Sequence, residues 1–317
     1  MNPTVAMSKE RLIILMANAD VVCNLCGSTK NAFVFNLRDW RIYIPGHWAL
    51  YQCQNCGVKF IYPQPDWKQL SSHYPKTYHA YLQPGAKGPR KWLLNYGLKR
   101  RVRIAIDHEP TSGTLLDIGC ASGEFLEYFV KHTNWKGIGI EPIEHAAELA
   151  QKKGLTVIKG TLNDANFESS FFDVITLWDV LEHLPNPASS LKECARLLKP
   201  SGKLIIKVPD SGGLEAEKFM EYWSGYEAPQ HLFGFTKRSL TLFLNKISFA
   251  SFRYFQVGSD QSCYLNSIAN TLSARNKVKL AKQITGLSRI KIFSIFIGLT
   301  RHLGFTSSIT LSARKQG

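Results

Sequence analysis

Four cysteines near the N-terminus have the spacing of a metal site. Cys23 and Cys26 lie in "CNLCG", and Cys53 and Cys56 lie in "CQNCG". Two such turns present four thiolates to one tetrahedral ion, and the glycine after each pair lets backbone N–H groups approach the sulfurs. We predict a structural zinc ion, because four cysteine ligands leave no open coordination position. Two disulfides are the alternative, but the remaining cysteines are isolated, which suits a reducing cytoplasm.

A second stretch with chemical meaning is "LLDIGCASGEF", residues 115–125. Its loop of small residues lets a ligand approach the backbone. It departs from the dinucleotide pattern G-x-G-x-x-G, because the positions counted from Gly119 hold Gly119, Ala121 and Glu124. Asp117 before the loop and Glu124 in the first helical turn repel phosphate and attract cations. We therefore predict a ligand with a positive portion near the loop and no phosphate there.

The elements that position this loop alternate between apolar strands and amphipathic helices. The expected strands cover residues 114–118, 137–141, 155–159, 174–178 and 203–208, and the expected helices cover residues 123–131, 143–152 and 188–198. A tight turn is expected at "KPSGK", residues 199–203, followed later by a helix at 237–245 and strands at 252–257 and 308–315. This alternation predicts a parallel, doubly wound α/β sheet with its site at the carboxyl ends of the strands.

Glu141 ends the second strand of this sheet, where an acid accepts hydrogen bonds from ribose hydroxyls in nucleoside-binding α/β folds. A ribose joined to a cationic amino-acid end describes S-adenosylmethionine. Residues 114–209 resemble the class I S-adenosylmethionine-dependent methyltransferases through "LLDIGCASGEF", "GIGIEP", "FDVITLWDVLEHLPNP" and "LLKPSGKLIIKVP". The resemblance implies a Rossmann-like, mainly parallel sheet of seven strands, the last of them antiparallel.

The resemblance also implies roles for single residues. Asp117, Gly119 and Gly123 would line the methionyl end of the cofactor, with Ala121 where the family usually has glycine. Glu141 would hold the ribose. The remaining cofactor-side candidates are Thr161 and Leu162 beside the adenine, Trp178 and Asp179 at the end of the fourth strand, and His183 just after it.

A proton must leave an oxygen or carbon acceptor, which calls for a base. His231 lies in "YEAPQHLFGFTKRSL", a stretch that resembles the aromatic-rich histidine motif of zinc-ribbon sugar methyltransferases. The resemblance implies that His231 is this base. Tyr226 is a second catalytic candidate, in an assisting role. The alternative is a structural histidine that caps the following helix.

We expect a chain divided into a small zinc module and one large domain. The expected parts are an N-terminal extension (1–20), a zinc ribbon (21–63), a linker with a covering helix (64–110) and a methyltransferase domain (111–317). A basic amphipathic insert is expected at 264–305. It is either a lid over the active site or, through residues 275–303, a peripheral membrane contact.

The net charge of +15 is concentrated in residues 87–103 and 275–315, which contain no acidic residue. Such segments meet phosphate-bearing ligands or anionic lipid, or are solvated helix faces.

The family resemblance favours a small-molecule acceptor, a sugar or glycan intermediate linked to a nucleotide or lipid, in a cytoplasmic protein. An RNA methyltransferase fits less well, because "WDVLEH" replaces the Asn/Asp-Pro-Pro-aromatic motif of enzymes that methylate amines. A binding protein with a retained cofactor site is the non-enzymatic alternative.

Overall fold

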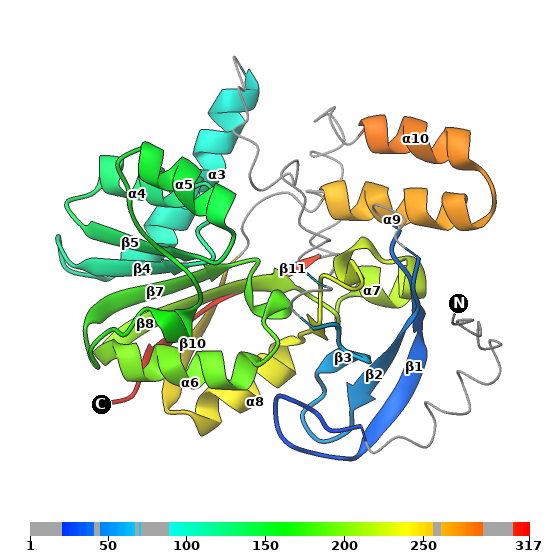
Figure 1. Ribbon diagram of the computed structural model, residues 1–317, viewed down its shortest axis with the longest axis horizontal. Helices are drawn as coiled ribbons and strands as arrows, with labels where there is room; N and C mark the ends of the chain where they lie inside the picture. Colours follow the sequence, from blue (N-terminus) through cyan, green and yellow to red (C-terminus); the bar gives the residue numbers. More distant parts are fainter. Residues whose placement is uncertain (1–20, 41–44, 67–69, 71–88, 256–260, 288–306) are drawn as a thin grey trace, which may run out of the picture.

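The structure is a computed structural model of the 317-residue chain, and it describes residues 21–40, 45–66, 70, 89–255, 261–287 and 307–317. The predicted extension at 1–20 and most of the predicted linker lie outside these residues. In the described part, the strands form one sheet of seven strands and one of four (Figure 1).

The larger sheet carries the predicted alternation. Its strands are β4 (Thr114–Ile118), β5 (Lys136–Glu141), β6 (Thr156–Lys159), β7 (Phe172–Trp178), β8 (Leu198–Pro209), β10 (Phe249–Phe255) and β11 (Ser308–Lys315). They run in the order β10-β11-β8-β7-β4-β5-β6, and neighbouring strands are parallel except where β11 pairs with β10 and with β8. The predicted Rossmann-like sheet with an antiparallel last strand is therefore confirmed.

Helices cover both faces of this sheet, as Figure 1 shows. One face carries α3 (Pro89–Ile106), α4 (Glu124–His132) and α5 (Glu144–Lys152), and the other carries α6 (Pro187–Leu197) and α8 (Lys237–Lys246). Neighbouring residues of β4 point to opposite faces, because side chains alternate along a strand. Leu115 packs into the core beneath α3, α4 and α5, and Leu116 packs into the core on the side of α6.

The predicted turn at 199–203 lies inside β8 and not before it. Leu198 already pairs with Phe172, and the next pair joins Lys203 to Val174, so the intervening residues bulge out of the ladder. Ser201 has a φ of 63° at this bulge. The bulge extends β8 and leaves the rest of the strand in register with β7.

The four-stranded sheet holds the predicted ribbon together with a strand from much later in the chain. Its strands are β1 (Asn31–Leu37), β2 (Trp48–Cys53), β3 (Lys59–Tyr62) and β9 (Phe233–Gly234), in that order. Phe60 of β3 pairs with Phe233 of β9, and the Ile61 N–H donates to the Leu232 carbonyl at 3.0 Å. The ribbon and the large domain therefore share backbone hydrogen bonds and one apolar core.

The remaining elements follow β6, β7, β8 and β10. They are η1 (Leu162–Asp164), η2 (Leu181–His183), α7 (Leu214–Phe219), η3 (Met220–Tyr222), η4 (Ser224–Tyr226), α9 (Gln261–Ala274) and α10 (Val278–Leu287). Helices α9 and α10 form the described part of the predicted insert, and residues 288–306 lie outside the described chain. None of the described helices combines the length and the apolar character needed to cross a bilayer.

Candidate active site and cysteine cluster

The loop between β4 and α4 requires small residues. Gly119 and Gly123 have φ angles of 68° and 81°, in the left-handed region that favours glycine. A Cβ on Gly119 would lie 2.6 Å from Val180 Cγ2, and one on Gly123 would lie 2.5 Å from Leu155 Cδ1. Ala121 also has a positive φ, of 48°, which its small side chain tolerates at some cost. A larger side chain at Gly119 or Gly123 would therefore clash with Val180 or Leu155.

Two buried carboxylates lie beneath this loop. Asp117 accepts a hydrogen bond from Thr176 Oγ1 at 2.7 Å. Glu141 accepts one from the Ala121 N–H and one from the Ile143 N–H, each at 2.9 Å, and so holds the loop against β5. Burial raises the pKa of Asp117 to about 7, although the Thr176 hydrogen bond opposes the shift. Burial also raises the pKa of Glu141. Acids at these positions fit an ammonium group and ribose hydroxyls.

Thr161 and Leu162 lie beside this pair at the end of β6. The Gly160 N–H donates to the Glu141 carbonyl at 3.0 Å, which fixes the turn next to β5. Thr161 then begins η1, where Asp164 Oδ2 accepts from its N–H at 2.8 Å and from its hydroxyl at 2.7 Å. Leu162 is buried. These two residues thus lie next to Glu141 at the end of β6, and their contact with the adenine stays a prediction.

Trp178 ends β7, Asp179 follows it, and two basic side chains lie close to them. The Arg101 guanidinium of α3 lies 4.9 Å from the Trp178 ring centroid and 3.8 Å from Asp179. Lys207 Nζ of β8 lies 2.5 Å from the Asp179 carboxylate. Burial alone would raise the pKa of Asp179, but the positive charges of Lys207 and Arg101 outweigh it and lower that pKa. The sequence did not indicate that Arg101 and Lys207 pair with Asp179, because the three residues are far apart in the chain.

The two candidate histidines are in contact. The rings of His183 and His231 have centroids 4.6 Å apart and an interplanar angle of 77°. His183 Nδ1 lies 2.9 Å from the Gln230 carbonyl, and His231 Nδ1 lies 2.7 Å from the Gly225 carbonyl. A carbonyl only accepts, so each Nδ1 carries a proton and donates it. Burial, and then the neighbouring His231, lower the pKa of His183 to about 3, which keeps that ring neutral.

Helix α8 is capped by Thr236 and not by His231. The Thr236 hydroxyl accepts from the Ser239 N–H, and the Ser239 hydroxyl accepts in turn from the Thr236 N–H. This capping box satisfies the start of the helix. The alternative in which His231 caps the following helix is therefore wrong.

A cavity of about 1420 Å³ opens beside His231. It lies between the ribbon, the ends of β7 and β8, and helices α9 and α10. Its lining includes Arg38, Trp40 and His47 of the ribbon region, Asp179, Lys207, Tyr226 and His231 near the strand ends, and Asn270, Ala281 and Lys282 of the insert. The insert thus forms a wall of the cavity, whereas the loop at 119–123 does not line it.

Tyr226 lies at the contact between the ribbon and the large domain. Only 4% of it is exposed, and its hydroxyl accepts a hydrogen bond from Lys59 Nζ at 3.2 Å. Lys59, on β3, also donates to the Ser211 carbonyl at 2.8 Å. Burial raises the pKa of Tyr226, so its phenol stays protonated at neutral pH. These contacts join the ribbon to the segment that carries His231.

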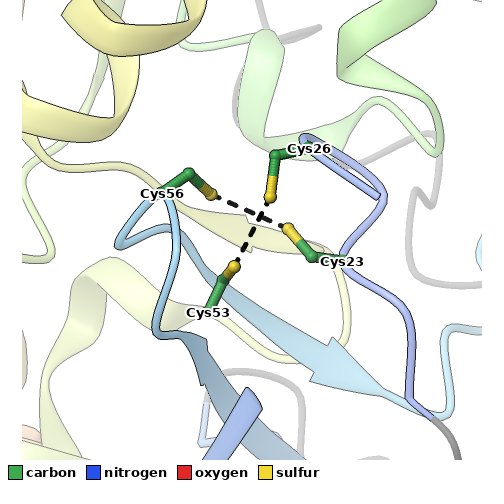
Figure 2. A group of neighbouring side chains, drawn as sticks. All are labelled: Cys23, Cys26, Cys53 and Cys56. Carbon is green, nitrogen blue, oxygen red and sulfur yellow. Dashed lines mark hydrogen bonds between the residues drawn. The ribbon is translucent and has the colours of Figure 1, made fainter. Parts of the chain in front are cut away.

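The four ribbon cysteines point toward one centre, as Figure 2 shows. Cys23 Sγ lies 3.8 Å from Cys56 Sγ, and Cys26 Sγ lies 3.5 Å from Cys53 Sγ. A zinc ion with Zn–S bonds of about 2.3 Å would place tetrahedral sulfurs about 3.8 Å apart. The sulfurs are too distant for the about 2.05 Å bond of a disulfide, and all four cysteines are free. The donor set and spacing therefore fit zinc.

Residues 91–250 match a protein family described as "Methyltransferase domain". This match covers half of the chain. The chain belongs to this methyltransferase-domain family.

Curated relatives of this methyltransferase-domain chain include two proteins named ubiquinone biosynthesis O-methyltransferase. The one from Vibrio campbellii is 38% identical over 100 residues, which are 29% of this chain and 42% of that protein. The one from Xanthomonas axonopodis pv. citri is 30% identical over 131 residues, which are 38% of this chain and 53% of that protein. The chain thus spans about half the length of these curated relatives.

Solved structures share the fold. The cyclopropane synthase MmaA2 from Mycobacterium tuberculosis has a TM-score of 0.53 and 17% identity, and the match covers 80% of this chain and all (100%) of that chain. The [4+2]-cyclase SpnF has a TM-score of 0.51 and 16% identity, with 80% of this chain and 97% of that chain covered. At such identities the likeness extends to the fold alone.

One acidic residue of this methyltransferase domain went unnoticed in the sequence. Glu182 precedes His183 in η2 and is 1% exposed. Neither carboxylate oxygen has a hydrogen-bond partner among the described residues. Burial raises the pKa of Glu182 well above its usual value. One oxygen of Glu182 and one ring nitrogen each of His183 and His231 lie within 4.8 Å of one another. The adjacent Glu-His pair in "LEH" was the signal that could have revealed this cluster.

Proposed function

We propose that this chain transfers a methyl group from S-adenosylmethionine to an oxygen of a small-molecule acceptor. The observation that carries the proposal is the combination of two buried acids beneath a tight loop with a histidine pair whose His231 lines a large cavity. Membership of the methyltransferase-domain family supports the reaction. The curated relatives, named O-methyltransferases, favour oxygen over carbon as the acceptor atom.

The chain's own residues would hold the cofactor at the β4–β5 edge. Asp117 would face the ammonium group, which favours the ionised carboxylate, and Glu141 would accept from the ribose hydroxyls with the lone pairs left by its two backbone donors. Thr161 and Leu162 would flank the adenine. Bound there, the cofactor supplies an electrophilic methyl group, and the protein's task is to align the acceptor oxygen with it.

The acceptor would occupy the cavity beside His231. Its volume of about 1420 Å³ exceeds the roughly 300–1,000 Å³ of a pocket for a drug-sized ligand. Arg38, His47 and Lys207 give its wall donors for hydroxyl and phosphate oxygens. We propose a sugar or glycan intermediate carried on a nucleotide or lipid phosphate, with His231 promoting loss of the acceptor's proton.

The ribbon would contribute one wall of this cavity and would be held by a structural zinc ion on Cys23, Cys26, Cys53 and Cys56. Its role is architectural, because four thiolates fill a tetrahedral site. We propose 21–63 as the ribbon and 111–317 as the methyltransferase domain, linked through β9.

Helix α10 supports a peripheral membrane contact as part of this proposal. Leu280 is exposed on it away from the residues that line the cavity, and the exposed Lys277 and Lys279 add positive charge beside it. Exposed apolar and basic side chains on one helix favour an anionic membrane interface. A lipid-linked acceptor would be reached from such a position.

The test is label transfer. Purified protein is incubated with methyl-labelled S-adenosylmethionine and a bacterial extract, and the products are separated into small molecules, lipid and RNA. We expect the wild type to place label in the small-molecule or lipid fraction. The variant His231→Gln is the matched negative control, and we expect it to transfer little label. Label that ribonuclease removes would replace this proposal with RNA methylation. Cofactor binding without label in any fraction would favour a binding protein.

A further inference from the structure

Among the described residues, the Glu182 carboxylate has no hydrogen-bond partner, although a buried acid needs one. Both of its oxygens are inaccessible to solvent, and neither accepts or donates a hydrogen bond within the part of the chain that the structure describes. Buried polar groups are hydrogen-bonded or coordinated in the great majority of proteins, because desolvation without compensation costs free energy. A ligand that meets this carboxylate would remove that cost.

The groups nearest to the carboxylate are the two histidines. One oxygen of Glu182 and one nitrogen from each ring lie within 4.8 Å of one another, so one ion could contact all three. Both rings direct Nδ1 at a backbone carbonyl, His183 at Gln230 and His231 at Gly225. Histidines that bind a metal through one ring nitrogen typically hold the other in this way, which fixes the tautomer and the ring plane.

We propose that Glu182, His183 and His231 form a binding site for a divalent cation of borderline softness, such as Mn²⁺ or Zn²⁺, and that this cation binds the acceptor hydroxyl. Two imidazoles and one carboxylate form a donor set that suits such ions and leaves coordination positions open. His231 also lines the cavity, so an open position can face the acceptor. The inference rests on the proposed methyl transfer and assigns its acceptor site.

The cation would act as a Lewis acid toward the acceptor. Coordination lowers the pKa of the hydroxyl, whose O–H bond breaks and whose proton passes to water in the cavity. A new C–O bond then forms to the methyl carbon, while the S–C bond breaks and its electron pair stays on the sulfur. In this arrangement His231 promotes proton loss as a ligand, and no free imidazole base is needed.

Mn²⁺ binding tests the site independently of turnover. Mn²⁺ is titrated into protein that holds one zinc ion per chain, the amount that the four ribbon thiolates bind, and the signal of the free ion is followed by electron paramagnetic resonance, since thiolates are poor ligands for Mn²⁺. The variant is Glu182→Gln, which keeps the shape and removes a charged ligand. The matched control is Glu144→Gln, whose side chain is 79% exposed on α5. Calorimetry with S-adenosylmethionine is run on the same samples.

We expect the wild type and Glu144→Gln to bind Mn²⁺, and Glu182→Gln to bind it at least about 10-fold more weakly with unchanged cofactor affinity. His231→Gln provides the same test should Glu182→Gln fail to fold. Wild-type protein that binds S-adenosylmethionine but no Mn²⁺ below about 1 mM would overturn the cation site alone, as would equal Mn²⁺ affinity in Glu182→Gln. Absence of cofactor binding would instead contradict the proposed function.

Discussion

The two sides of the candidate site are built in different ways. On the proposed cofactor side, Asp117, Gly119 and Gly123 lie in one short stretch, and the Glu141 carboxylate accepts a hydrogen bond from the Ala121 N–H of that stretch. On the acceptor side, the cavity is assembled from the ribbon, two strand ends, the loop before β9 and the insert. A local motif constrains the first side, whereas the second exists only after distant segments have packed. Damage to distant packing should therefore affect the acceptor side first.

Loss of the zinc ion should have the largest effect and should separate the two sides. In Cys23→Ser/Cys56→Ser, we expect the ribbon to lose its fold, because a structural zinc supplies much of the folding free energy of such a module. β3 pairs with β9 close to His231, so the acceptor side should be disrupted. We expect methyl transfer to fall at least about 100-fold, while S-adenosylmethionine affinity changes by less than about 3-fold.

Zinc content, circular dichroism and calorimetry check this prediction on the same preparation. Equal losses of cofactor affinity and turnover would show that the two sides fold as one unit. Full activity with an empty ribbon would show that the acceptor does not depend on it.

Substitution of His231 should have the second largest effect on activity. His231→Gln should lower kcat by about 10²–10⁴-fold, because a positioned group that promotes proton loss contributes on this scale. Cofactor affinity should be unchanged, since His231 lies on the cavity side. Steady-state kinetics with His132→Gln as control measure the effect, because His132 is exposed at the far end of α4. A kcat close to that of the wild type would remove His231 from the proposed chemistry.

The same contrast explains what the sequence could predict. The strand at 114–118 and the final strand at 308–315 were predicted with the bounds that the structure shows, because each is a continuous apolar or alternating run. The four cysteines were predicted from their spacing and do come together. By contrast, β9 holds two residues and Arg101 reaches Trp178 from another element, and neither leaves a local pattern. Glu182 was missed because the Glu-His pair in "LEH" was its one sequence signal, and its burial, a tertiary property, leaves no local pattern. The roles of the individual site residues remain predictions.

Asp117 tests the cofactor side. Asp117→Asn should weaken S-adenosylmethionine binding about 10–100-fold, because a charged partner of the ammonium is lost. The folded carboxyl has a pKa of about 7 against an ordinary value of 3.8, and cofactor binding favours its ionised form. Wild-type affinity should therefore rise with pH up to about 7 and then level off, with a slope of at most about tenfold per unit. Asp117→Asn should lack this rise.

Stability without cofactor should show the opposite trend. Between about pH 4 and 7 the folded state keeps a proton on Asp117 that the unfolded chain releases, so the Asp117 contribution to stability falls as pH rises through this window. Calorimetric affinities and denaturant midpoints at several pH values test both signs. A pH-independent affinity in the wild type would show that Asp117 does not face the cation.

The smallest expected effect is that of Tyr226→Phe, and it sharpens the comparison from the acceptor side. A raised pKa keeps the phenol protonated, and its hydroxyl accepts from Lys59, so the side chain joins two parts of the molecule instead of removing a proton. We expect kcat to change by less than about 3-fold and the free energy of unfolding to fall by about 1 kcal/mol, the typical value of one hydrogen bond. Lys59→Met removes a second bond, to the Ser211 carbonyl, and should cost more. Lys59 makes two of these structural hydrogen bonds and Tyr226 makes one, so a purely structural effect on kcat should be larger in Lys59→Met. A larger loss of kcat in Tyr226→Phe would instead show that the phenol takes part in the chemistry.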